Sequence, residues 1–468
     1  MYAILLYVAE PFLNRIAELQ TLEEAWREPG ADLVLVWGRR RAGKTRLLGQ
    51  LAAGKRAIFY GATQQSSAAE LAGLSECARR ALQPSGTDLL ALGDFASWEV
   101  ALDYLGEQAA NERLLVVLDE FPYLIGSAPA LPSLIQRFWD HRARDTRLML
   151  VLCGSAQSAM LELQAVSAPL YGRIDSRLQV RPFAYREAAL FTPGLSPAEL
   201  ATVYGTLGGM PVYLSRWRSG QGRDVNLRRL FGDASSPLVE EGEFVLTSEL
   251  PEAAGYFRIL HGIATGHRTF NALREFAAMD IKRQLDRLLE LGLVLREVPA
   301  TEDAARSKRV IYRIGDNFLD FWFRFVFRRR ADIARGLGRE VVDRTILPGL
   351  DDHMGAIWEE MCRDFVRRRA AQGALPVPVS SVGRWWNRDN SVEVDVVGMD
   401  GRKVVLAGSV KWSHTAGRAE LQRLQQAVEA LPDRAAHVQL VLFARERVRD
   451  VDPTEALTFT AADLYAGL

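Results

Sequence analysis

The chain has 468 residues, of which 48% are hydrophobic and 25% charged, and its 58 basic side chains are balanced by 58 acidic ones. This length exceeds a single hydrophobic core and indicates several domains. The zero net charge excludes a global attraction to nucleic acid, so any contact with DNA must come from a local patch. Three widely spaced cysteines without a metal-ligand pattern are typical of a reducing, cytoplasmic environment. The apolar segment Met1 to Ala9 is too short to span a bilayer, and we expect no membrane association.

The first clear element is an apolar run over residues 33–37, long enough for one buried strand. It leads into a segment that fits G-x-x-x-x-G-K-[ST], after which the residues up to Leu51 are typical of a helix. Strand, glycine-rich turn and helix together predict a phosphate cradle, in which Lys44 reaches the β- and γ-phosphates and Thr45 binds Mg²⁺. The predicted ATP site comprises Gly38, Arg39, Arg40, Arg41, Ala42, Gly43, Lys44, Thr45 and Arg46.

A second apolar run, residues 114–118, ends in Asp119 and Glu120. The carboxyl end of a parallel strand is where an open α/β sheet places its ligands. We expect Asp119 to hold Mg²⁺ and Glu120 to orient and deprotonate the attacking water. The alternative is a solvated strand end, which acidic residues often occupy. A glutamate beside the aspartate favours hydrolysis over binding alone.

A third strand over residues 148–153 runs into Ser155, a candidate sensor of the γ-phosphate. A Gly-Ser turn after any strand has the same appearance. Arg173 is a candidate arginine finger, and the alternative is an ordinary surface arginine in an arginine-rich chain. A finger acting on a neighbouring copy would require a homo-oligomer.

Several phrases follow one another in a recognisable order, and together they resemble the archaeal-type ATPase family, relatives of the AAA+ and STAND NTPases. They are the segments 11–19, 38–45, 118–124, 153–155, 171–173, 181–183, 208–214 and 312–325. The resemblance implies an α/β fold with an AAA+-like P-loop core over residues 11–185 and a helical lid over 186–250. A winged helix would follow over 251–315, and a domain related to PD-(D/E)XK nucleases over 316–468. It also supports Ser155 as sensor and Arg173 as a phosphate-facing arginine.

Residues 251–315 have the pattern of three helices followed by a β-hairpin, as in a winged helix-turn-helix. The third helix, predicted over 281–291, directs leucines inward and basic side chains outward. Strands over 293–296 and 310–313 would flank a polar wing. Contact with double-stranded DNA is predicted through Lys282, Arg283 and Arg287 of the helix and Lys308 of the wing, with Arg306 and Arg309 beside it. The alternative is a module that packs as a lid or binds protein.

The last hundred residues alternate strands and a helix in an order that resembles the PD-(D/E)XK core. We expect strands over 391–397, 404–412 and 438–443, a turn over 398–402 and a helix over 420–431. The resemblance assigns Glu359, Asp395 and Lys411 to the nuclease motif and expects an acidic residue two positions before the lysine. That position is Ser409. Because Mg²⁺ prefers carboxylate oxygens, we expect this site to be degenerate.

Two classes of function remain open from the sequence. The first is an Mg²⁺-dependent ATPase whose cycle changes conformation on DNA. The second is an ATP-bound, STAND-like switch that recruits protein partners. An active DNA nuclease is a third and less favoured hypothesis, because of Ser409.

Overall fold

The computed structural model describes residues 12–83, 88–250 and 253–468, so the segment Met1 to Ala9 lies outside the described residues. The chain divides into two compact units, Met1–Pro182 and Phe183–Leu468. The boundary between them lies close to residue 185, where the P-loop core is expected to end, and this division does not separate the three later segments from one another. No helix within the described ranges is long and apolar enough to cross a membrane.

The first unit is built on a five-stranded parallel sheet in the order β2-β3-β4-β1-β5. Its strands are β1 (Asp32–Trp37), β2 (Ala57–Gly61), β3 (Leu114–Asp119), β4 (Leu148–Gly154) and β5 (Ser176–Gln179). β3 and β4 are buried along their whole length, which explains their continuous apolar sequence. Because these strands run parallel, the carboxyl ends of β1, β3 and β4 meet at one edge of the sheet.

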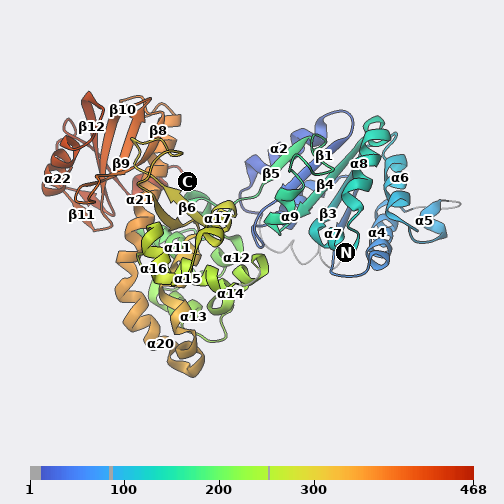
Figure 1. Cartoon of the computed structure of the whole chain (residues 1–468), viewed down its shortest axis with the longest axis horizontal. Coiled ribbons are helices and arrows are strands. Elements are labelled where there is room, and N and C mark those ends of the chain that lie inside the picture. The colour runs from blue at the N-terminus through green and yellow to red at the C-terminus, as the bar shows by residue number, and fades with distance from the viewer. Residues whose placement is uncertain (1–11, 84–87, 251–252) are drawn as a thin grey trace. The chain divides into compact units, whose positions relative to one another are not determined.

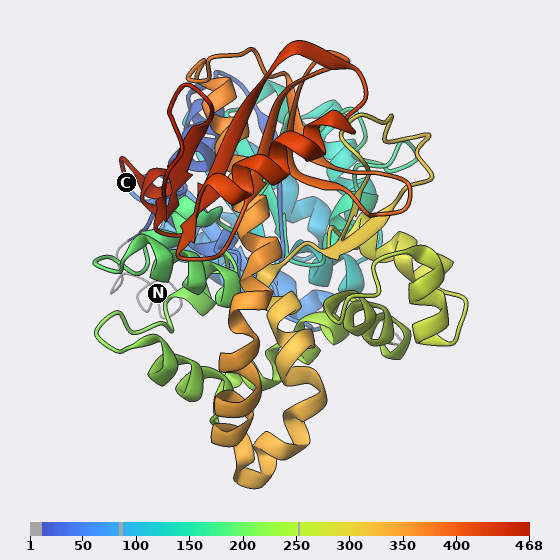
Figure 2. The same cartoon turned by 90° about the vertical axis from the view of Figure 1, so that its left-hand side faces the viewer.

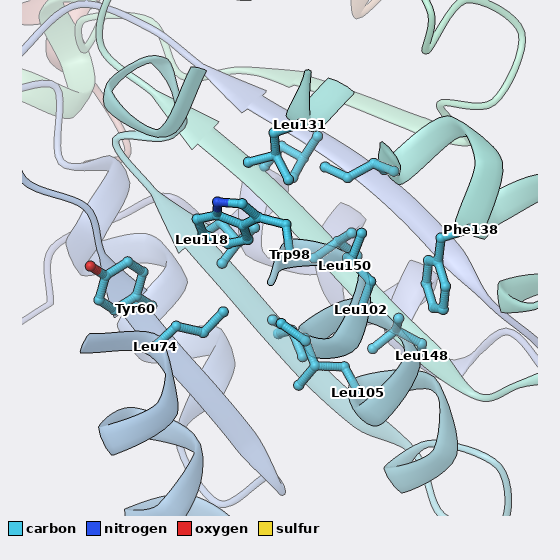
Figure 3. Packing of buried hydrophobic residues seen from close by; sticks show 14 of the residues in the cluster. Tyr60, Leu74, Trp98, Leu102, Leu105, Leu118, Leu131, Phe138, Leu148 and Leu150 are labelled. Carbon is cyan, nitrogen blue, oxygen red and sulfur yellow. The ribbon is translucent and has the colours of Figure 1, made fainter. Parts of the chain in front are cut away.

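Helices bury this sheet (Figure 1). They are α2 (Ile16–Arg27), α3 (Lys44–Ala52), α4 (Ser67–Leu82), α5 (Leu89–Leu92), α6 (Trp98–Gln108), α7 (Phe121–Ser127), α8 (Leu131–His141) and α9 (Gln157–Glu162). One core cluster joins the strands to α4, α6 and α8. Figure 3 shows Trp98 and Leu102 of α6 close to Leu118 of β3 and Leu150 of β4. This packing fixes the strands whose carboxyl ends carry the polar motifs.

The second unit begins with helices, as expected for residues 186–250. They are α10 (Tyr185–Ala189), α11 (Pro197–Leu207), α12 (Pro211–Leu214), α13 (Arg223–Phe231) and α14 (Pro237–Glu249). Three further helices, α15 (Ala254–Ala264), α16 (Phe270–Ala277) and α17 (Lys282–Glu290), precede an antiparallel hairpin of β6 (Val294–Glu297) and β7 (Ile311–Ile314). The predicted order of three helices and a hairpin is therefore present.

An aromatic segment with mostly buried side chains follows the hairpin. Its spacing predicts one buried helical face, and the chain runs through α18 (Asn317–Phe321) into a π-helical turn over Trp322–Val326. The wider π turn places Phe323 inside as well as Trp322, and both are completely buried. After α19 (Arg330–Asp332) and α20 (Gly338–Val341), the long helix α21 (Leu347–Ala371) leads to the C-terminal sheet.

The C-terminal sheet is mixed, in the order β14-β12-β10-β9-β8. Its strands are β8 (Ser381–Trp386), β9 (Glu393–Asp400), β10 (Lys403–Val410), β12 (Arg434–Ala444) and β14 (Leu457–Thr460). Helix α22 (Arg418–Glu429) packs on one face, as Figure 2 shows, and α21 contacts β8, β9 and β10. Short strands β11 (Thr415–Ala416) and β13 (Arg447–Val448) pair beside it, and α23 (Ala461–Tyr465) ends the chain.

The expected turn over 398–402 is wrong in extent. Gly398 lies inside β9, opposite Leu406 of β10, and the turn comprises only Gly401 and Arg402. A Cβ on Gly398 would lie 3.0 Å from the Cβ of Leu406, so this glycine serves close packing between strands. Gly401, at φ 56°, makes the turn itself.

Candidate nucleotide-binding and active site

The loop between β1 and α3 is shaped by its two motif glycines. Gly43 is the N-cap of α3 and has φ 93°, a left-handed conformation that glycine adopts without strain. Gly38 lies against the chain that leaves β5, and a Cβ there would be 2.2 Å from the carbonyl oxygen of Val180. One glycine therefore permits close approach of the loop to its neighbour, and the other turns the chain into the helix.

Lys44 lies inside this loop. It is 5% exposed, and its Nζ donates hydrogen bonds to the carbonyl oxygens of Gly38 (2.8 Å) and Arg39 (3.1 Å). An ammonium group has three donors, so two are used within the loop. The charge lies at the N-terminus of α3, where unpaired backbone N–H groups and the helix dipole add positive potential. The arrangement favours an anion.

Thr45 connects this loop to β3. Its Oγ1 donates a hydrogen bond of 2.6 Å to Oδ2 of Asp119, which ends β3 and is 4% exposed. Beneath them, burial and the nearby Asp119 carboxylate raise the pKa of the Cys153 thiol well above its usual value, in keeping with a packing role for Cys153. A hydroxyl and a carboxylate from separate motifs thus meet beside Lys44.

Glu120 follows Asp119 and begins α7 with φ 53°, a conformation that costs a non-glycine residue about 1 kcal/mol. Its Oε2 accepts hydrogen bonds from the backbone N–H (3.1 Å) and the hydroxyl (2.8 Å) of Ser155, just beyond β4. Its own backbone N–H donates to Oδ1 of Asp119 at 3.0 Å. The structure therefore brings Lys44, Thr45, Asp119, Glu120 and Ser155 to the same edge of the sheet.

Arg173 is not part of this cluster in the structure. Its Nε and Nη2 donate to Asp140 of α8 at 2.8 and 2.7 Å, and its Nη1 donates to the carbonyl oxygens of Pro169 and Tyr171. The guanidinium holds the pKa of the Asp140 carboxyl below its usual value. The other predicted arginines differ in exposure: Arg39 is buried, Arg41 and Arg46 are half-buried, and Arg40 is exposed.

Arg15 is a site residue that motif reasoning did not identify. It is 4% exposed, caps the N-terminus of α2 and has φ 63°. Its Nη2 donates to the carbonyl oxygens of Ala42 in the loop (3.0 Å) and of Arg181 after β5 (2.7 Å), and its Nη1 pairs with Glu18 at 2.6 Å. The signal in the sequence was the phrase Phe12-Leu13-Asn14-Arg15 itself, whose partners only the fold reveals.

Comparison with known proteins agrees with this geometry. Residues 12–217 match the model of an ATPase domain found predominantly in Archaea. Residues 12–217 therefore belong to this archaeal-type ATPase family. Residues 322–424 match a second model, of archaeal and bacterial proteins of unknown function.

Three relatives of this archaeal-type ATPase illustrate the range of similarity. An uncharacterized protein of Methanocaldococcus jannaschii is 29% identical over 409 residues, which are 86% of this chain and 87% of the relative. An uncharacterized ATP-binding protein of the same organism is 46% identical over 48 residues, 10% of this chain and 73% of the relative. The structure of the Walker-type ATPase of Pyrococcus abyssi covers 67% of this chain and 96% of its own, with a TM-score of 0.52 and 19% identity. This last likeness confirms the P-loop ATPase fold.

The nuclease-like residues of this archaeal-type ATPase also meet in space. Glu359 lies on α21 and Asp395 on β9, and burial raises the pKa of both carboxyls. The Asp395 charge raises the pKa of Glu359 further, while the Val410 N–H, which donates to Asp395 Oδ2 at 2.8 Å, and Lys411 oppose the rise at Asp395. Lys411 is exposed just beyond β10, and Ser409 is half-buried on that strand.

The DNA candidates lie on α17 and on the segment between β6 and β7. Lys282 pairs with Asp286 at 3.2 Å, and Arg287 pairs with Glu290 at 2.5 Å. Arg283, Arg306 and Lys308 are exposed. Arg309 does not extend from the wing: it pairs with Glu302 at 2.5 Å, and its Nη1 donates to the carbonyl oxygen of Trp386 on β8, also at 2.5 Å.

Proposed function

We propose that this ATPase couples Mg²⁺-dependent ATP hydrolysis to a conformational change while it contacts double-stranded DNA. The observation that carries the ATPase part is the convergence of Lys44, Thr45 and Asp119 at one sheet edge, with the threonine hydroxyl 2.6 Å from the carboxylate. A buried ammonium group beside two oxygen donors suits a triphosphate with its metal, because Mg²⁺ takes hydroxyl and carboxylate oxygens.

Each of these residues would have a separate task. Bound Mg²⁺ would neutralise charge on the phosphate oxygens. Thr45 and Asp119 would hold it, and Lys44 would donate to the β- and γ-phosphates through its remaining N–H. The N-terminus of α3 would add its positive potential.

Glu120 would take the proton of the attacking water, and Ser155 would position the Glu120 carboxylate. The two hydrogen bonds from Ser155 orient the Glu120 carboxylate and link the end of β4 to the start of α7. If loss of the γ-phosphate changed one of these bonds, the end of β4 and the start of α7 would both shift. This is the basis of the sensor role we propose for Ser155.

Contact with DNA would use the outer face of α17. Lys282 and Arg283 are exposed there, and the pairing of Lys282 with Asp286 is a weak surface ion pair that a phosphate can replace. Lys308 would add a contact from the wing. Arg309 would instead anchor the wing to β8, so only the tip of the wing is available to DNA.

The test is ATP hydrolysis by the full chain with and without duplex DNA, beside Lys44→Ala. We expect turnover that DNA stimulates and that Lys44→Ala abolishes. Reversing Lys282 and Arg283 to glutamate should remove the stimulation without lowering basal turnover. Arg423→Glu is the matched control, because Arg423 is an exposed arginine on α22.

Two results would redirect the proposal. Tight ATP binding without turnover in either condition would favour the nucleotide-controlled switch that recruits protein partners. Turnover that is indifferent to DNA would leave the ATPase assignment intact and remove the DNA contact.

A further inference from the structure

Arg363 lies in the middle of the nuclease-like residues. It is 3% exposed and one helical turn beyond Glu359 on α21. Its Nη1 donates to the main-chain oxygen of Asp395 at 2.9 Å and lies 3.5 Å from Oε2 of Glu359, while its Nε donates to Oε2 of Glu360 at 3.0 Å. The guanidinium therefore joins α21 to β9 at the two acidic residues that a nuclease would use for its metal.

The remaining groups do not suit a divalent cation. Ser409 contributes no negative charge where the nuclease resemblance expects a carboxylate. Across residues 12–83, 88–250 and 253–468, no group of at least three His, Cys, Asp or Glu side chains is arranged to hold a metal ion. A guanidinium keeps its proton at any pH a protein meets, so it is a permanent positive neighbour that repels a second cation.

The hairpin of β6 and β7 covers one side of the constellation formed by Glu359, Asp395 and Arg363, namely the side on which Glu359 lies. Glu359 and Arg363 line a cavity of about 50 Å³ whose other walls include Glu297 of β6 and Arg313 of β7. Arg313 is paired with Glu297 and lies 3.5 Å from Glu360. This volume is far below the several hundred Å³ of a small-molecule site. Opposite charges from α21 and the hairpin thus form ion pairs around a small cavity.

The hairpin is also fixed to the sheet by its backbone. The N–H of Ala300, just after β6, donates to the carbonyl oxygen of Arg384 on β8 at 2.8 Å. Arg384 also reaches Glu393 at 3.0 Å and lies 4.0 Å from Glu297. The charged groups thus connect the hairpin to α21, and this backbone bond connects it to β8 of the sheet.

We propose that Arg363 is the resident cation of this constellation, taking the place of the divalent metal that a PD-(D/E)XK nuclease carries. Glu359, Asp395 and Arg363 then form a metal-free ionic joint between α21, the sheet and the hairpin. This assignment is independent of the ATP site.

The proposal is tested by measuring Mn²⁺ binding to the nucleotide-free full chain by calorimetric titration. Mn²⁺ that binds near Thr45 and Asp119 does so in every variant. Differences in Mn²⁺ binding between variants therefore come from the C-terminal site. We expect Asp395→Asn to leave Mn²⁺ binding unchanged and Ser409→Glu alone to add no site. Ser409→Glu combined with Arg363→Gln should add a Mn²⁺ site that a further Asp395→Asn change removes.

Thermal unfolding adds a measurement that does not depend on the double variant. Arg363→Gln should lower the unfolding midpoint clearly more than Arg367→Gln, because Arg367 is an exposed arginine on the same helix that also pairs with Glu360. Loss of Mn²⁺ binding in Asp395→Asn alone would overturn the proposal. So would a new Mn²⁺ site in Ser409→Glu with Arg363 intact, or equal midpoints for the two arginine variants.

Discussion

Replacing Arg15 by alanine tests whether the phosphate-binding loop depends on a residue outside its motif. The change removes the donor to the Ala42 carbonyl inside the loop and to the Arg181 carbonyl after β5. Because Arg15 is 4% exposed, water does not readily replace these bonds. The left-handed backbone at this position is as unfavourable for alanine as for arginine, so it cancels in the comparison.

The expected magnitude follows from the two hydrogen bonds. A hydrogen bond from a charged group contributes about 1.5–3 kcal/mol, so losing both destabilises the first unit by about 3 kcal/mol. For a unit of this size that corresponds to a fall in Tm of roughly 10 °C. Only the bond to Ala42 acts on the loop itself. If this bond holds the loop in the conformation that binds nucleotide, its loss lowers ATP affinity by about 10- to 100-fold.

The assay is equilibrium titration with ATP, together with thermal unfolding of the full chain. Arg27→Ala is the matched control, because Arg27 is an exposed arginine at the other end of α2. Arg15→Lys should be intermediate, since an ammonium group keeps the charge without the planar fork. ATP affinity within about twofold of wild type in Arg15→Ala, a difference of about 0.4 kcal/mol, would refute the reasoning.

Three further predictions concern Glu120, Ser155 and the half-buried Glu360. Glu120→Gln should retain ATP binding and lower kcat by roughly 10²- to 10⁴-fold in steady-state assays, and unimpaired turnover would remove its role as base. Ser155→Ala keeps the backbone donor and loses only the hydroxyl, so kcat should fall about tenfold with little change in KM, and an effect as large as that of Glu120→Gln would contradict this division of roles. Burial tends to raise the pKa of Glu360, but Arg363, Arg313 and Arg367 overcome it and hold that pKa at about 2, below its usual 4.5. Its contribution to stability is therefore complete above pH 4.5 and is lost as the pH falls toward 2. Glu360→Gln should flatten the pH dependence of Tm in that window, and an unchanged profile would contradict the assignment.

The order of the elements was readable from the sequence because it depends on local patterns. The apolar runs that became β1, β3 and β4 are continuous, as buried parallel strands require, and Gly43 meets a conformational demand of the loop itself. The convergence of Thr45 and Asp119 follows from the same patterns, because both end or follow strands of one parallel sheet. The π turn at Trp322 was missed, since it inserts an extra residue that no periodicity shows.

The sequence by itself determined a P-loop ATPase whose phosphate loop and acidic strand end share one edge of a sheet. The tertiary structure decided which side chains are partners across long distances in the chain. Arg15 reaches Arg181, Glu120 reaches Ser155, Arg173 turns to Asp140, and Arg363 takes its place beside Asp395. The sequence around an arginine or a carboxylate is the same whether its side chain faces water, a phosphate or another charge. Its partner is fixed only when packing brings two segments within hydrogen-bonding distance.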